Sequence, residues 1–220
     1  MYKFFCDTKV DNYFLLDEQT QNHLKVIRIK NNDFIINYQN EFYLCNLIEK
    51  NKAVIKSKLD INNELGYEII VALPIIKHNH FEIALQKATE LGATKIIPFI
   101  SSYTDKSNLN IENKYSRFKK IILEAAQQSF RNKIPSLEKI ELFENILDIN
   151  IESKILAYEN EKDKKIEKVT SDTMIIVGPE GGFSDEEITL AKKKNVAIVS
   201  LTKTILRAET AIIYMLSKIN

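Results

Sequence analysis

The sequence predicts an α/β protein in which a small β-rich part precedes a larger part of alternating strands and helices. Three observations lead to this prediction. Up to about residue 65 the β-forming segments are short, and beyond it apolar strand-like runs alternate with amphipathic helical runs. Three of the five glycines also lie within five residues, between a strand-like run and a helix start. Since alternating strands and helices build parallel sheets, the larger part is predicted to be a parallel α/β domain.

The first part is predicted to be a small β-barrel, residues 1–66, with residues 62–66 as its linker. Turn-forming Asn, Asp and Gln separate the strand candidates, and a short helix is predicted over residues 18–26. The predicted strands are residues 2–5, 33–38, 41–48 and 53–57.

The second part, residues 67–220, is predicted to alternate strands and helices to its end. Apolar residues recur at helical spacing over residues 80–91, and Gly92 closes that helix. The predicted strands are residues 68–73, 95–100, 154–158, 173–177 and 196–201. The other predicted helices are residues 115–130, 186–194 and 208–219.

Composition argues against a globally basic nucleic-acid binder, a membrane-spanning or secreted protein, and a cysteine- or histidine-based metal site. The net charge is +1, so any nucleic-acid-binding surface has to be a local basic patch. No run has the ~18 consecutive apolar residues of a membrane span, and the N-terminus lacks the features of a signal peptide. Cys6 and Cys45 have no metal-ligand spacing and are expected to be reduced thiols, which predicts a cytoplasmic protein. The three histidines are too scattered for a metal site, and His78 and His80 are expected in a loop.

The glycine cluster predicts a ligand-binding loop. Gly178, Gly181 and Gly182 follow an apolar run and precede Ser184, which with Glu187 forms the pattern of a capping box. Ligands of open α/β sheets bind at the carboxyl ends of strands, and glycine lets the backbone approach them. The loop lacks the P-loop and GxGxxG patterns, which favours a neutral or zwitterionic ligand. A tight turn without a ligand is the alternative.

Two motifs together identify a family. GPEGGF at residues 178–183, followed by ILRAETA at residues 205–211, resembles the ribosomal RNA small subunit methyltransferase E family of the SPOUT superfamily. KATELG at residues 87–92, EAAQQSFR at 124–131 and HLKVIRIK at 23–30 extend the resemblance over nearly the whole chain. The chain departs from the family pattern at Phe130 and Thr202, where glycine is usual.

The resemblance implies a PUA-like barrel over residues 1–66 and a SPOUT domain with a deep trefoil knot over residues 67–220. It implies a homodimer that needs no metal. The implied reaction transfers a methyl group from S-adenosylmethionine to N3 of a uridine in 16S rRNA, within the 30S subunit. The cofactor would lie among three loops, at about residues 156–159, 178–182 and 200–211.

The resemblance also implies site residues. The expected cofactor-binding residues are Leu156, Ala157, Tyr158, Val177, Gly178, Pro179, Glu180, Gly181, Gly182, Ser200, Leu201, Ile205, Leu206, Ala208 and Thr210. A branched side chain at Gly181 is expected to block the cofactor. The expected catalytic residues are Arg207, which could stabilise the uridine anion or anchor the nucleotide, and Glu209, which could orient Arg207 or the helix start.

A further set is expected to contact RNA. Its members are His23, Lys25, Arg28, Lys30, Lys77, Gln127, Gln128 and Arg131. Each expectation has a structural alternative: Arg207 and Glu209 could be an ion pair at the knot or dimer interface, and the basic residues could be a solvated face. Two other functions also stay open, a methyltransferase of the same fold acting on tRNA or 23S rRNA, and a non-catalytic RNA-binding or assembly factor.

Overall fold

The computed structural model describes residues 1–29 and 33–219 and forms two compact units. The first unit contains residues 1–64 together with residues 127–133, and the remaining described residues form the second. The division predicted from the sequence did not include the return of residues 127–133 to the first unit.

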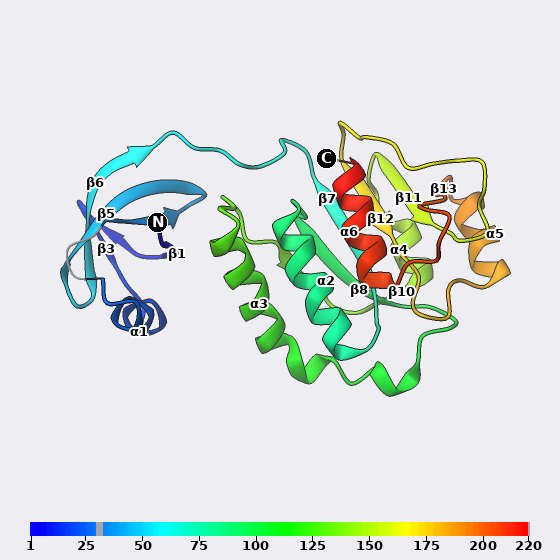
Figure 1. Ribbon diagram of the computed structural model, residues 1–220, viewed down its shortest axis with the longest axis horizontal. Coiled ribbons are helices and arrows are strands. Elements are labelled where there is room, and N and C mark those ends of the chain that lie inside the picture. Colours follow the sequence, from blue (N-terminus) through cyan, green and yellow to red (C-terminus); the bar gives the residue numbers. More distant parts are fainter. Residues whose placement is uncertain (30–32, 220) are drawn as a thin grey trace. The chain divides into compact units, whose positions relative to one another are not determined.

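The first unit is a six-stranded sheet with one helix against it (Figure 1). The strand order is β1-β4-β5-β6-β3-β2; β1 and β4 are parallel, and the other neighbours are antiparallel. Its elements are β1 (Lys3–Phe5), β2 (Lys9–Val10), β3 (Tyr13–Leu15), α1 (Glu18–Val26), β4 (Phe34–Tyr38), β5 (Glu41–Glu49) and β6 (Lys52–Leu59). The strands β2 and β3, of two and three residues, were not among the predicted strands. The PUA-like assignment stays a prediction.

The helix α1 shows how local sequence sets an element. Asp17 is its N-cap, and the Asp17 carboxylate accepts the backbone N–H of Thr20 at 2.7 Å. Leu24 is buried on its inner face, among the aromatic residues Phe4, Phe14 and Phe34 of the sheet. The apolar face therefore fixes which side of α1 is left to solvent. The exposed Lys25 lies there, whereas the ring of His23 also packs edge-on against Phe4, with ring centroids 5.3 Å apart.

The second unit is a parallel sheet, as the alternation of strands and helices predicts. The strand order is β10-β8-β7-β12-β11-β13, with β9 paired to β8 beside this path. The strands are β7 (Ile69–Pro74), β8 (Lys95–Ile100), β9 (Ser136–Leu137), β10 (Glu141–Leu142), β11 (Ser153–Ala157), β12 (Thr173–Ile176) and β13 (Ala197–Val199). The helices are α2 (His78–Glu90), α3 (Tyr115–Gln128), α4 (Phe143–Asp148), α5 (Asp185–Lys193) and α6 (Ala208–Ile219), with 3₁₀ turns at Lys106–Asn108 and Glu112–Lys114.

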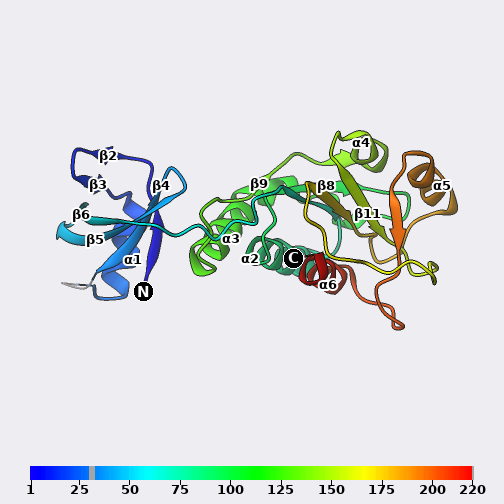
Figure 2. The same ribbon diagram turned by 90° about the horizontal axis from the view of Figure 1, so that it is seen from above.

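Helices cover both faces of this sheet (Figure 2). Along β7, Ile69, Val71 and Leu73 pack with α2, α3 and α6, whereas Ile70 and Ala72 pack with α4 and α5. Both faces of the central strands are therefore buried, which explains why their sequences are continuous apolar runs rather than alternating ones. The predicted knot stays a prediction. Within the described residues, no helix combines the length and apolar character needed to cross a membrane.

Candidate active site

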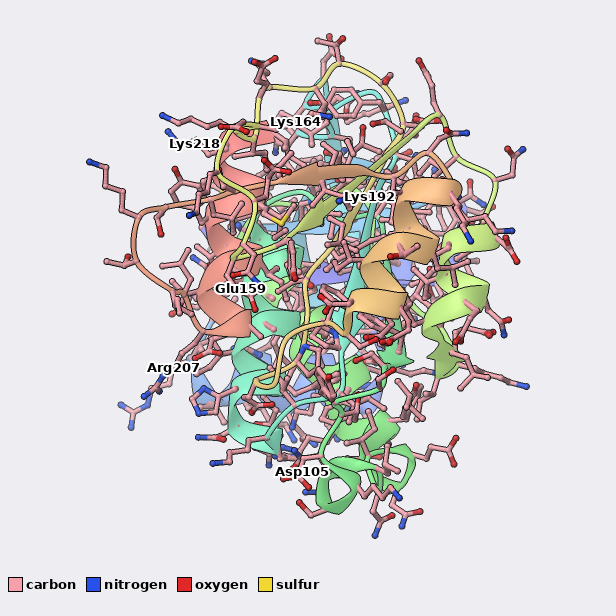
Figure 3. All side chains as sticks on the ribbon, turned by 90° about the vertical axis from the view of Figure 1, so that its right-hand side faces the viewer. Asp105, Glu159, Lys164, Lys192, Arg207 and Lys218 are labelled. Carbon is pink, nitrogen blue, oxygen red and sulfur yellow. The ribbon has the colours of Figure 1, made fainter. Side chains whose placement is uncertain are left out.

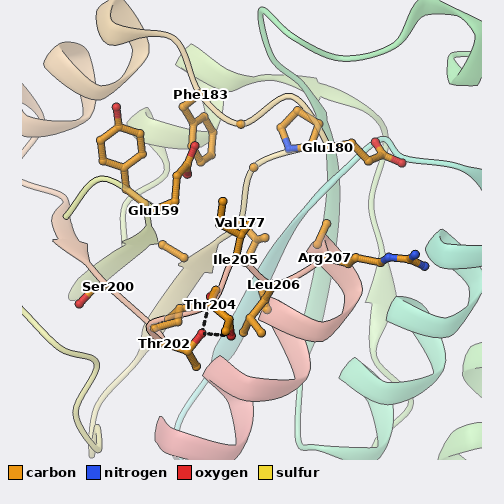
Figure 4. A pocket seen from close by; sticks show the side chains of 18 of the residues that line it. Glu159, Val177, Glu180, Phe183, Ser200, Thr202, Thr204, Ile205, Leu206 and Arg207 are labelled. Carbon is orange, nitrogen blue, oxygen red and sulfur yellow. Dashed lines mark hydrogen bonds between the residues drawn. The ribbon is translucent and has the colours of Figure 1, made fainter. Parts of the chain in front are cut away.

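Three loops at one edge of the parallel sheet form a pocket of about 300 Å³ (Figure 4). The strands β12, β11 and β13 are neighbours and parallel, so their carboxyl ends meet at the same edge. The loops that follow them contribute residues 157–159, 177–180, 182–183 and 200–207, and the start of α6 completes the wall. Ligands of parallel α/β sheets bind at such an edge.

The structure brings together most of the residues predicted from the sequence for this site. The predicted residues that line the pocket are Ala157, Tyr158, Val177, Gly178, Pro179, Glu180, Gly182, Ser200, Leu201, Ile205, Leu206 and Ala208. Three others do not line it, because Leu156 is fully buried in the core, Thr210 is exposed on α6, and Gly181 faces away.

Six lining residues besides Arg207, which was assigned to catalysis, were not named as cofactor-binding residues, although all but Phe183 lie within the three loops implied by the resemblance. They are Glu159, Phe183, Thr202, Lys203, Thr204 and Ala211. Phe183 lies in the GPEGGF motif, and Thr202 to Thr204 directly precede ILRAETA. Their positions next to these motifs could have indicated that they line the pocket. Ala211 lies one helical turn after Arg207, which makes it reachable from the helical period alone.

The glycine loop has a different reason for glycine at each position. Gly182 has a φ of +71°, which favours glycine, and its N–H closes a turn on the carbonyl of Pro179 at 2.9 Å. A Cβ at Gly178 would come within 3.0 Å of the Phe183 ring. At Gly181 a Cβ would come within 2.8 Å of Tyr103 Cβ. The expectation that a side chain at Gly181 enters the ligand face is therefore wrong in direction, because that position faces Tyr103.

The predicted capping box is confirmed, and it also anchors a second loop. The Ser184 hydroxyl accepts the N–H of Glu187, while the Glu187 carboxylate accepts the N–H of Ser184 at 2.9 Å. The same carboxylate accepts the N–H of Ser102 at 2.8 Å, and Glu187 is only 6% exposed. The buried acid therefore ties the loop after β8 to the end of the glycine loop.

The third loop, residues 200–207, is anchored at its start and exposed in its middle. Ser200 donates through its N–H and its hydroxyl to the carbonyl of Lys164, at 2.7 and 3.1 Å. The hydroxyl of Thr202 donates to the carbonyl of Thr204, so a threonine closes this turn where the family pattern has glycine. Ile205 is 86% exposed, an unusual position for a large apolar side chain beside a pocket.

The two residues predicted to be catalytic lie in different surroundings. Arg207 lines the pocket but its side chain extends outward into solvent (Figures 3 and 4). Glu209 is 9% exposed, and its carboxylate lies 2.7 Å from His80 Nδ1. Glu209 therefore contacts His80 and not Arg207 as one of the expectations had it. His78 and His80 lie in the first turn of α2, which corrects their expected place in a loop.

The residues predicted to contact RNA are not gathered at one place. In the first unit, His23, Lys25 and Arg28 are exposed, and Lys30 lies outside the described residues. Gln128 is exposed and Gln127 is half-buried; in the second unit, Lys77 is exposed. Arg131 is only 4% exposed, because its guanidinium pairs with Glu64. We therefore replace the expected RNA contact of Arg131 with a structural role.

No group of three or more metal-ligating side chains occurs among the described residues. The polar side chains at the pocket include Glu159, Glu180, Lys203 and Arg207, which carry both signs of charge. Its apolar lining comes from residues such as Val177, Leu201 and Leu206. Apolar walls with a few polar groups suit a small organic ligand that carries charges of its own.

Comparison with known proteins gives consistent matches. A family model described as RNA methyltransferase domain matches residues 63–220. Ribosomal RNA small subunit methyltransferase E from Mesomycoplasma hyopneumoniae (strain 232) is 43% identical over 99% of this chain and 98% of its own length. The protein of the same name from Rickettsia conorii is 34% identical over 88% of this chain and 83% of its own length.

A solved structure has the same fold. The crystal structure of a ribosomal RNA small subunit methyltransferase E from Neisseria gonorrhoeae, bound to S-adenosyl methionine, superposes with a TM-score of 0.89. The match covers 99% of this chain and 95% of that one, at 26% sequence identity.

Proposed function

The chain belongs to the ribosomal RNA small subunit methyltransferase E family, and we propose that it transfers a methyl group from S-adenosylmethionine to N3 of a uridine in 16S rRNA. The observation that carries this proposal is the pocket at the carboxyl ends of β11, β12 and β13, with the glycine loop in its wall. The relatives' names support a ribosomal RNA of the small subunit as the substrate. The uridine and its N3 atom come from the family resemblance.

The pocket residues fit S-adenosylmethionine. The volume of about 300 Å³ is at the lower end of small-molecule sites, which span roughly 300–1,000 Å³. Leu201, Ile205 and Leu206 supply backbone groups and apolar side chains suited to an adenine ring. Gly178 and Gly182 line the pocket without side chains, so their backbone groups would be available to the ribose and methionine portions. The carboxylates of Glu159 and Glu180 suit a ligand that bears ammonium and sulfonium charges.

The chemistry places modest demands on the protein. S-adenosylmethionine supplies a methyl group already activated by its sulfonium sulfur. The chain therefore has to orient the uridine and favour loss of its N3 proton. Negative charge then develops on the uridine carbonyl oxygens, where a guanidinium would stabilise it. Arg207 suits this role, because it lines the pocket and forms no ion pair with any residue that the structure describes.

Glu209 suits a positioning role. Its carboxylate holds His80 at the start of α2 while its backbone lies in the first turn of α6, two residues after Arg207. This contact links the starts of two adjacent helices and so supports the segment from which Arg207 projects. We propose that Glu209 acts through that support and not through the substrate.

The other parts of the chain are proposed to hold the RNA. We propose that residues 1–66 form a PUA-like RNA-binding domain, and that residues 67–220 form a knotted SPOUT methyltransferase domain that dimerises. His23, Lys25, Arg28 and Lys30 would contact the RNA backbone from the first domain, together with Gln127 and Gln128, which return to the first unit, and with Lys77 of the second unit. The substrate is proposed to be the 30S subunit, which places the protein in the cytoplasm.

A radiolabel assay tests the reaction. The protein would be incubated with methyl-labelled S-adenosylmethionine and 30S subunits from a strain that lacks this methylation, and the rRNA nucleosides would then be separated. We expect label in 3-methyluridine and in no other nucleoside. Arg207→Ala should lower turnover strongly while calorimetry shows near-normal cofactor affinity. Label in tRNA or 23S rRNA alone would favour the same fold acting on another RNA.

Cofactor binding without transfer to any ribosomal substrate would contradict the enzymatic proposal. The chain would then be a non-catalytic RNA-binding or assembly factor that keeps the pocket. Equal losses of turnover and cofactor affinity in Arg207→Ala would instead indicate that Arg207 contacts the cofactor.

A further inference from the structure

An exposed aromatic side chain stands directly behind the glycine loop of the pocket. Tyr103 lies between β8 and the 3₁₀ turn at Lys106–Asn108, and it is 54% exposed. Its Cβ lies so close to Gly181 that a Cβ on that glycine would come within 2.8 Å of it. Glu180 and Gly182, on either side of Gly181, both line the pocket. Tyr103 therefore lies against a residue whose two sequence neighbours line the pocket.

The backbone that carries Tyr103 is fixed by hydrogen bonds. Ser102 donates its N–H to the buried carboxylate of Glu187 at 2.8 Å. Ser101 donates its N–H to the Thr104 hydroxyl at 2.9 Å, and Thr104 returns its N–H to the carbonyl of Ser101 at 3.1 Å. A ring held on such a turn loses little conformational freedom when a flat ligand stacks on it.

Neither packing nor hydrogen bonding accounts for an aromatic residue here. The Tyr103 side chain is absent from the apolar clusters, and no hydrogen bond to its hydroxyl occurs among the described residues. The neighbour that Tyr103 does contact is Gly181, where any side chain would collide with Tyr103. Lys77 is also exposed nearby: its backbone N–H donates to Glu180 at 3.3 Å, in the same glycine loop, and its charge acts on Asp105, two residues after Tyr103.

We propose that Tyr103 is a positioning residue on whose exposed ring a base of the RNA substrate, next to the target uridine, stacks beside the glycine loop. This inference rests on the proposed function. A base that is to be methylated on its pairing edge has to leave its helix, which also unstacks the neighbouring bases, and an unstacked base needs a new partner for its face. Aromatic side chains provide that partner for any base, and Lys77 is placed to meet an adjacent phosphate.

The test compares Tyr103→Ala with Tyr103→Phe, using 30S subunits from the unmethylated strain. Loss of stacking is worth about 1–3 kcal/mol per base, so Tyr103→Ala should lower kcat/KM for the 30S subunit about 5- to 150-fold. Tyr103→Phe keeps the ring face and should stay within about threefold of the wild type. Calorimetry should give the same S-adenosylmethionine Kd for all three proteins.

Leu142→Ala is the matched control, because Leu142 is also about half exposed, at 53%, and does not line the pocket. It should leave both constants unchanged. The proposal is overturned if Tyr103→Ala methylates normally, if Tyr103→Phe is as impaired as Tyr103→Ala, or if the cofactor Kd rises along with the loss. Absence of methyl transfer by the wild type would instead overturn the proposed function, and this inference with it.

Discussion

Glu64 and Arg131 lie 67 residues apart in the sequence and form a two-point ion pair inside the first unit. Arg131 donates through Nε to Glu64 Oε1 at 3.0 Å and through Nη2 to Oε2 at 2.6 Å. The backbone N–H groups of Asn132 and Lys133 also donate to Oε1, at 2.7 and 3.0 Å. One carboxylate therefore holds the chain that returns to the first unit after α3.

Replacing Arg131 should destabilise this unit. The Arg131 side chain is 4% exposed and that of Glu64 is 12% exposed, so Arg131→Ala leaves a largely buried carboxylate without its cation. We expect a loss of about 3 kcal/mol in the free energy of unfolding. Urea unfolding, together with faster amide exchange at Asn132 and Lys133, checks this. Lys133→Ala is the control, since its exposed side chain can be removed while its N–H still reaches Glu64. Equal stability of the two variants would contradict the assignment.

The same pair predicts an acid sensitivity. Burial disfavours ionisation of Glu64, but the hydrogen bond and charge of Arg131 outweigh it, so the pKa of Glu64 is lowered from its ordinary 4.5. A carboxyl group with a lowered folded-state pKa stabilises the fold fully above the ordinary value and loses that contribution as pH falls through the lowered one. The stability difference between wild type and Glu64→Gln should therefore be constant from pH 7 to about 5 and shrink below 4.5. A difference that persists in acid would argue against an ionic contribution.

Phe130 has a strained backbone that glycine would relieve. Its φ is +61°, a left-handed conformation that costs a side-chain-bearing residue about 1–2 kcal/mol. The ring offsets this cost, because its centroid lies 5.5 Å from that of Phe42 and 3.4 Å from Lys3 Nζ. Phe130→Ala removes the ring contacts but keeps the backbone strain, whereas Phe130→Gly removes the ring contacts and the strain. We expect the glycine variant to be about 1 kcal/mol more stable than the alanine variant in thermal or urea unfolding. An alanine variant as stable as the glycine variant would show that the turn relaxes.

Much of the fold could be predicted because its signals are local. The capping box of Ser184 and Glu187 needs four consecutive residues, and α6 needs one apolar face. The strands β9 and β10 have two residues each, too few for a periodic pattern, and they depend on pairing with β8. The helix α4 has six residues and no side-chain cap. Such short elements exist because of tertiary contacts, which a sequence pattern does not record.

The features of the site also divide into those marked by local sequence and those that depend on contacts between distant parts of the chain. Its loops could be located because the glycine cluster and the GPEGGF and ILRAETA motifs mark them. The contacts that assign roles could not, since Arg131 with Glu64, Glu209 with His80 and Gly181 with Tyr103 each join distant parts of the chain. Arg131 shows the consequence most clearly, because an arginine beside a polar helix end resembles an RNA contact until its buried partner is known.

Gly182 should be needed for cofactor binding more than for stability. Alanine at this φ of +71° is strained, and its Cβ would come within 2.8 Å of Glu159 Oε1, a carboxylate of the pocket. Gly66→Ala is the matched control, because Gly66 has a φ of +84° and nothing within 4 Å of an added Cβ. Both variants should lose about 1–2 kcal/mol of stability from backbone strain. Only Gly182→Ala should weaken S-adenosylmethionine binding in calorimetry, and a parallel loss in Gly66→Ala would refute a local effect.

His80 and Glu209 should be energetically coupled. His80 Nδ1 lies 2.7 Å from Glu209 Oε1, and the two side chains are 21% and 12% exposed. A carboxylate only accepts hydrogen bonds, so the ring nitrogen is the donor, and removing either partner leaves a half-buried polar group unpaired. A double-mutant cycle of His80→Ala and Glu209→Ala at pH 7 should give a coupling of about 1–2 kcal/mol.

His78 provides the control for this cycle. It lies in the same turn of α2 but pairs with Glu82, at 3.2 Å, so His78→Ala and Glu209→Ala should be additive within about 0.5 kcal/mol. If His80 and Glu209 also prove additive, the contact does not join the starts of α2 and α6. Any loss of turnover in Glu209→Ala would then have to come from contact with the substrate. If they are coupled, the His80→Ala variant should lower turnover by the same factor as Glu209→Ala, because both would release the segment that carries Arg207.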